Sequence, residues 1–118
     1  MPTTHYWFVQ WNLLPLIIDG SKDLEARFGY PWIRRVAVED IIIFNHNAKA
    51  VRKVVAIRPY KNFDQVLGVE DHERIYPGLK DYKRAPIMRR LRQDPNQPLG
   101  VFVFELQPVV LAAHGASS

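Results

Sequence analysis

Three charged side chains of mixed sign, Lys22, Glu25 and Arg27, follow directly after Gly20. In a strand, Glu25 and Arg27 point to one face and Leu24 to the other, because side chains alternate along a sheet. A cation here could meet a phosphate, and the carboxylate could accept from a base amino group. The same residues could equally form an intramolecular ion-pair cluster on a solvated face, and their spacing leaves both interpretations open.

A second group of cations lies in a basic segment, residues 79–98, with Tyr82 among them. Cations interleaved with an aromatic ring suit phosphate contact and base stacking. The alternative is a solvated helix that buries its apolar side. We expect Arg89, Arg90 and Arg92 to contact phosphates, so that replacing all three weakens RNA binding evenly across sequences and flattens its salt dependence.

The chain is rich in aromatic residues, most of which we expect in the core. Trp32 follows Gly29, Tyr30 and Pro31, which predict a loop, and is the best candidate for a base-stacking platform. We expect Lys22, Glu25 and Arg27 to line one pocket, with Tyr76 or Trp32 at its rim.

The apolar pattern predicts a chain that is mainly β with helices, an α+β fold. We expect a small, mostly antiparallel barrel plugged by short helices. Ile43 and Phe104 should be inaccessible in their strands. The expected strands cover residues 5–11, 22–28, 41–44, 50–60 and 101–106, and the expected helices cover 13–18, 62–67, 70–76 and 79–92, the last broken near Ala85 by Pro86.

The composition limits the possible functions. With 118 residues, the chain fits one domain, residues 1–118, whose last residues, 112–118, we expect to be disordered. It has no cysteine, which excludes disulfides and thiol nucleophiles. The net charge of +4 suggests an anionic partner. Scattered histidines predict no metal site, and we expect no cofactor. Without an apolar run of membrane length or a secretory signal, we expect a cytoplasmic protein with no membrane contact.

Four motifs in order resemble the ASCH domain family, a PUA-like β-barrel family. Gly20-x-Lys22-x-x-Glu25-x-Arg27 is similar to its G-x-K-x-x-E-x-R signature. Residues 38–44, 76–78 and 101–106 resemble its next strand motif, its Tyr-Pro element and its final strand. One departure is Glu39, which stands where the family usually has glycine. The resemblance implies a cleft that receives RNA or a nucleobase.

Some relatives in that family are amidohydrolases that remove acetyl from acetylcytidine, and the resemblance implies a Lys, Thr, Glu catalytic set for them. Lys22 matches their lysine, but Glu25 stands where they have the threonine, so the candidate nucleophile is missing. Glu70 and Glu73 are candidates for their glutamate. Hydrolysis here would need water activated by Glu25, with Lys22 as electrophile or proton shuttle.

The leading hypothesis is therefore a PUA-like module that binds RNA or a nucleotide through a Lys22/Glu25/Arg27 cleft and the basic segment. The first alternative is a small hydrolase acting on a modified nucleoside, or a ribonuclease. The second alternative is a protein-interaction domain in which the cleft is vestigial.

Overall fold

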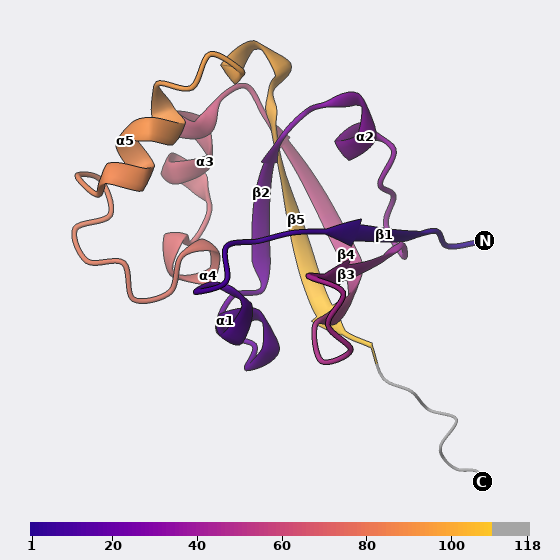
Figure 1. Ribbon diagram of the computed structural model, residues 1–118. Coiled ribbons are helices and arrows are strands. Elements are labelled where there is room, and N and C mark those ends of the chain that lie inside the picture. Colours follow the sequence, from indigo (N-terminus) through magenta and orange to yellow (C-terminus); the bar gives the residue numbers. More distant parts are fainter. Residues whose placement is uncertain (110–118) are drawn as a thin grey trace, which may run out of the picture.

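The computed structural model describes residues 1–109 (Figure 1). The tail expected to be disordered, residues 112–118, lies outside the described residues. Five strands form one mixed sheet in the order β1-β3-β4-β5-β2. The short β1 runs parallel to β3, and the other neighbours are antiparallel. The strands are β1 (Thr4–Trp7), β2 (Leu24–Phe28), β3 (Ile41–Phe44), β4 (Val51–Tyr60) and β5 (Val101–Pro108).

The sheet is open, so the expectation of a closed barrel is wrong. β1 and β2 are the two edges, and no main-chain ladder joins them within residues 1–109. β1 has only four residues and crosses the direction of β2 instead of running beside it (Figure 1). A side chain connects the two edges. The Arg27 guanidinium on β2 donates to the carbonyl of Phe8, directly after β1, at 2.8 Å.

The strands and helices make an α+β fold, as predicted, and short helices cover both faces of the sheet. One buried cluster contains residues of α1 and α2 together with Trp7 and Phe104. The other contains residues of α3, α4 and α5 together with Leu24 and Val103. The helices are α1 (Leu14–Ile18), α2 (Pro31–Arg34), α3 (Phe63–Val69), α4 (His72–Ile75) and α5 (Pro86–Arg92), with a 3-10 turn η1 (Gln97–Leu99).

Three local expectations need correction. Trp32 lies in helix α2, not in a loop, because Pro31 occupies a first-turn position where its missing N–H costs nothing. Pro86 likewise begins α5, so residues 79–85 form turns instead of the first part of one helix. Ile43 is only half-buried, since β3 buries alternate residues, whereas Phe104 is fully buried as expected.

The turn into β3 retains a glycine-like backbone without a glycine. Glu39 has φ +82°, in the left-handed region that favours glycine. Its N–H donates to the Val54 carbonyl at 2.8 Å, and the next residue, Asp40, accepts from the Thr3 and Ala37 N–H groups at 3.0 Å each. These bonds tie the turn to β4 and to the start of β1, and they hold Glu39 in a conformation that its side chain disfavours.

Candidate functional site

The three charged residues after Gly20 form one ion-pair cluster. The Lys22 ammonium is 2.8 Å from Glu25 Oε1, and the other carboxylate oxygen accepts from Arg27 Nε at 2.7 Å. Only 2% of Lys22 and 6% of Glu25 are exposed. The register pairs Glu25 with Phe104 and Arg27 with Phe102, so both charged residues face the same side of β2, as predicted.

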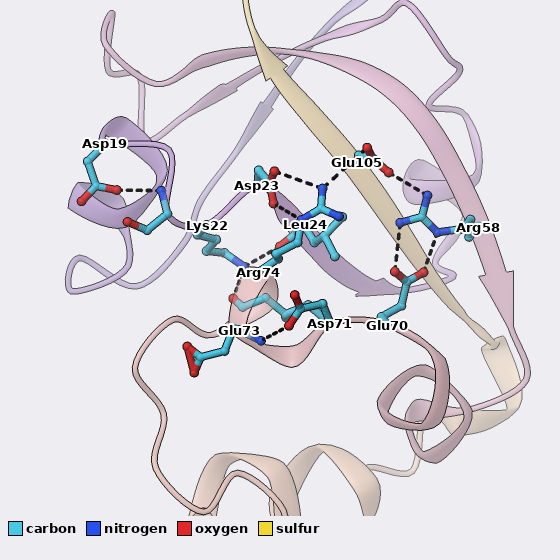
Figure 2. Close-up of polar contacts among 12 residues, drawn as sticks. Asp19, Lys22, Asp23, Leu24, Arg58, Glu70, Asp71, Glu73, Arg74 and Glu105 are labelled. Carbon is cyan, nitrogen blue, oxygen red and sulfur yellow. Dashed lines mark hydrogen bonds and ion pairs between the residues drawn. The ribbon is translucent and has the colours of Figure 1, made fainter.

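All three protons of the Lys22 ammonium have protein partners. Besides Glu25, it donates to the carbonyls of Leu24 at 2.9 Å and Ile75 at 2.7 Å (Figure 2). Ile75 ends helix α4, so this lysine joins the start of β2 to a helix far along the chain. A fully engaged, buried ammonium has no donor left for a phosphate or a substrate. Lys22 therefore has the geometry of a structural cation.

The backbone before the cluster directs Lys22 inward. Helix α1 ends at Ile18, and Gly20 takes φ +88°, which only glycine adopts without strain. The Lys22 N–H then donates to the Leu16 carbonyl at 2.9 Å. This turn reverses the direction of the chain after α1, and it directs the Lys22 side chain into the protein instead of into solvent.

The charge state of Glu25 follows from its neighbours. Burial acts to raise the pKa of this carboxyl, but the positive charges and hydrogen bonds of Lys22 and Arg27 outweigh burial and hold its pKa below the usual range. Glu25 is therefore ionised at neutral pH. A carboxylate stabilised in this way is a weak general base, because its affinity for a proton is reduced.

Arg27 links the cluster to the aromatic residues of β1. Its guanidinium lies 4.8 Å from the centre of the Trp7 ring, a cation–π distance. Its side chain remains 22% exposed, unlike those of Lys22 and Glu25. Of the three predicted site residues at this cluster, Arg27 is thus the one that solvent or a ligand reaches.

Beside the cluster lies a hollow of about 450 Å³, which we call the Tyr76 hollow. Its wall includes Gln10, Asn12, Tyr76, Pro77, Ile87 and Arg90. Lys22, Glu25 and Arg27 do not line it, so the structure does not place all the expected residues in one pocket. The Lys22 ammonium instead lies behind Tyr76, 5.3 Å from the ring centre. Burial, followed by the charge of Glu25, raises the pKa of Tyr76 to about 12, which keeps its hydroxyl protonated.

The sequence analysis missed Gln10 and Asn12, which lie between β1 and α1. No periodic pattern marks a polar residue in a short irregular connection. The Tyr76 hollow brings them together with α5, more than seventy residues away. Amide side chains both donate and accept, which is what reading a base edge requires.

The structure divides the three arginines of α5 between two places. Arg90 lines the Tyr76 hollow, whereas Arg89 and Arg92 border a separate, shallower hollow with Asp64. Arg92 donates to Asp64 at 2.5 Å and is therefore already paired. The expectation that all three act alike as phosphate contacts does not fit this arrangement.

Most other arginines are also engaged within residues 1–109. Arg34 and Arg52 donate to main-chain carbonyls. Arg58 and Arg74 form a ladder with Glu70, Glu105 and Asp23 (Figure 2). Within the described part of the chain, the arginines without an ion pair or side-chain hydrogen bond are Arg35, Arg89 and Arg90.

The two candidate glutamates do not contact Lys22. Glu70 accepts two bonds from Arg58, at 2.6 and 2.9 Å, and one from the Tyr60 hydroxyl at 2.5 Å. The hydrogen bonds from Arg58 are the main reason that its pKa lies below the usual range. Glu73 accepts from the Gly78 N–H and points away from the cluster (Figure 2).

Trp32 lies away from the Tyr76 hollow, on the other side of Trp7. It borders a second hollow of about 420 Å³, which we call the Trp32 hollow, lined by Thr3, His5, Tyr6, Trp7, Trp32 and Arg35. Trp7 contacts both Trp32, edge to face with centroids 6.1 Å apart, and Arg27. The predicted rim residues Tyr76 and Trp32 thus line different hollows.

This fold is similar to that of solved structures. A crystal structure of hypothetical protein PH0355 is 29% identical, with a TM-score of 0.78, and the match covers 91% of this chain and 100% of that one. The solution structure of protein PF0455 from Pyrococcus furiosus is 26% identical, with a TM-score of 0.69, and the match covers 91% and 98% of the two chains. Neither name states an activity. No family model and no curated protein matches the sequence.

Two further findings concern only residues 1–109. None of the helices there has the length and apolar character needed to cross a membrane. In the same residues, His, Asp and Glu side chains do not gather in a group of three or more that could hold a metal ion.

Proposed function

We propose that this chain is a PUA-like module of the ASCH type that binds single-stranded RNA or a nucleotide in the Tyr76 hollow. Arg90 carries the proposal. It is exposed, has no partner within residues 1–109, and lies at the wall of a hollow that also contains an aromatic ring and two amides. An unpaired guanidinium meets a phosphate, a ring stacks on a base, and amides read its edge.

The charge of the hollow supports an anionic ligand. Among the described residues, no Asp or Glu lines the Tyr76 hollow, so Arg90 has no competing anion there. Its volume of about 450 Å³ falls within the usual range of small-molecule sites. The Lys22–Glu25 pair supports the back of the Tyr76 ring and fixes the stacking surface before a ligand binds, which lowers the entropic cost of binding.

The backbone at Glu39 supports the ASCH resemblance. Its φ of +82° lies in the region that glycine adopts without strain, so the departure in sequence is accompanied by a glycine-like turn. We favour binding over hydrolysis, because the Lys22 ammonium has no free proton to donate and Glu25 has a lowered pKa. Hydrolysis by water that Glu25 activates, with Lys22 as electrophile or proton shuttle, would need both groups to be free to react.

The test compares two arginines in the same part of the chain. We expect Arg90→Ala to weaken binding of a labelled RNA of about eight nucleotides, a length that small modules cover, without changing the melting temperature. The loss should be about tenfold, the value of a charge-assisted hydrogen bond, measured by fluorescence anisotropy.

Arg84→Ala is the matched control. It removes the same charge from an exposed side chain that lies outside the Tyr76 hollow and is held only by a 3.9 Å contact to Asp81. Equal losses in the two variants would show that net charge alone attracts RNA. Unchanged binding in Arg90→Ala would remove the Tyr76 hollow as the site.

A further inference from the structure

The Trp32 hollow lies at the open edge of the sheet, between β1 and α2. Tyr6 and Trp32 face solvent with 57% and 45% of their surface. Both rings are held in place: Tyr6 stacks on His46 with centroids 5.3 Å apart, and Trp32 stacks on Tyr30 at 6.2 Å with the rings nearly parallel. Rings that are fixed yet exposed lose little entropy when another flat ring packs on them.

Arg35 gives this aromatic surface its charge. It is exposed, follows the last residue of α2, and has no ion pair or side-chain hydrogen bond among the described residues. The Trp32 hollow, like the Tyr76 hollow, is lined by no carboxylate of residues 1–109. Each hollow therefore combines an unpaired guanidinium with an aromatic ring. A ligand that carries flat rings and negative charge together matches both.

The two hollows are close along the chain. Trp7 lines the Trp32 hollow and Gln10 lines the Tyr76 hollow. Three residue steps span at most about 11 Å, even when fully extended. Arg27 lies between them, with its guanidinium over Trp7 and bonded to the Phe8 carbonyl. A partly exposed cation thus lies between the two aromatic sites, where a backbone phosphate would pass.

We propose that the Trp32 hollow is a second nucleobase subsite, in which Trp32 or Tyr6 stacks on a base and Arg35 contacts its phosphate. The natural ligand is then a single strand of several nucleotides that crosses Arg27, not a free mononucleotide. This inference rests on the proposed function, because it extends the ligand of the Tyr76 hollow.

The experiment measures affinity against ligand length, with adenosine monophosphate and oligoadenylates of increasing length as probes. In the wild-type protein, affinity should rise with length until both hollows are filled. Trp32→Leu and Arg35→Ala should each lose about tenfold for the longest strand, the usual effect of one stacked base or one phosphate contact, and bind the monophosphate as wild type does. Trp11→Leu, an exposed tryptophan outside the hollow, is the matched control and should behave as wild type.

The outcomes separate the two proposals. Arg90→Ala should weaken binding of every length, the monophosphate included, and no effect there would refute the Tyr76 hollow. In one outcome, Arg90→Ala loses affinity as expected, while the affinity of Arg35→Ala and Trp32→Leu rises with strand length as in the wild type. That result would overturn only the second subsite. If Trp32→Leu is unstable, Arg35→Ala and Tyr6→Leu decide. A different outcome is that the protein self-associates and that Tyr6→Leu abolishes this self-association without changing RNA affinity. That result would identify the Trp32 hollow as a protein contact and would also overturn the inference.

Discussion

Lys22 holds the start of β2 and the end of α4 together. Its ammonium compensates the buried Glu25 and two carbonyls, one from the next strand and one from α4. Spacing along the sequence correctly predicted that Glu25 and Arg27 share a face. It did not predict the burial of Lys22, because the Ile75 carbonyl that completes its coordination lies 53 residues away.

We expect Lys22→Met to lower the free energy of unfolding by about 3–5 kcal/mol, the usual cost of leaving one half of a buried ion pair. Lys53→Met is the control, since the Lys53 side chain is 40% exposed and its contact with Glu39 is loose, at 3.7 Å, so the change should cost less than about 1 kcal/mol. Urea unfolding of both variants measures the difference. A Lys22→Met protein as stable as wild type, yet unable to bind RNA, would make Lys22 a ligand contact and not a structural residue.

At the scale of elements, most strand positions followed from apolar runs, although the first strand ends at Trp7 and not at Trp11. Helix starts depended on two prolines. From the sequence, Pro31 predicted a loop and Pro86 predicted a break in a helix. In the structure each proline begins a short helix. Whether a proline begins a helix depends on how the residues after it pack. Ile33 of α2 is buried in one cluster and Met88 of α5 in the other. Tertiary packing of this kind is not encoded in local propensity.

The connection between β2 and α2 predicts a strong effect of a small substitution. A Cβ at Gly29 would lie 2.4 Å from the Leu99 carbonyl oxygen and 2.7 Å from the Phe102 ring, so the backbone would have to move. We expect Gly29→Ala to destabilise the fold by about 1–3 kcal/mol, as overpacking does.

Gly68→Ala gives the comparison, because nothing lies within 4 Å of a Cβ there. Alanine in helix α3 should raise stability by up to about 1 kcal/mol. Thermal melts of the two variants should therefore shift in opposite directions. A melting temperature for Gly29→Ala at or above that of wild type would contradict the close approach of η1 to β2.

For the whole molecule, the order of strands and helices correctly predicted an α+β fold, but the expected closure of the sheet into a barrel was wrong. The motif order and the apolar run of β5 were visible in the sequence. Whether β1 and β2 meet was not visible, because pairing between edges depends on the angle at which β1 crosses, which no local pattern sets. Arg27, Trp7 and the Trp32 hollow lie at this open edge, so the part of the fold that was predicted wrongly carries the proposed second subsite.

Strand β5 lies between β4 and β2 and contributes side chains to both faces of the sheet. Phe104 packs in one cluster and its neighbour Val103 in the other. We expect Phe104→Asp to abolish cooperative unfolding, because it buries a charge without a partner. Ile43→Asp is the matched control and should retain a melt, since Ile43 is only half-buried. Differential scanning calorimetry compares them, and a Phe104→Asp melt close to wild type would show that β5 is not central to the core.

The central claim is that RNA occupies the Tyr76 hollow, and an NMR titration of the isotope-labelled protein with a short single-stranded RNA tests it most directly. The account predicts shifts of the Gln10 and Asn12 side-chain amides, the Tyr76 backbone and the Arg90 guanidinium, and smaller shifts of the Gln10, Asn12 and Tyr76 signals in Arg90→Ala at the same concentrations. Shifts confined to residues 80–84, or none at saturating RNA, would contradict it.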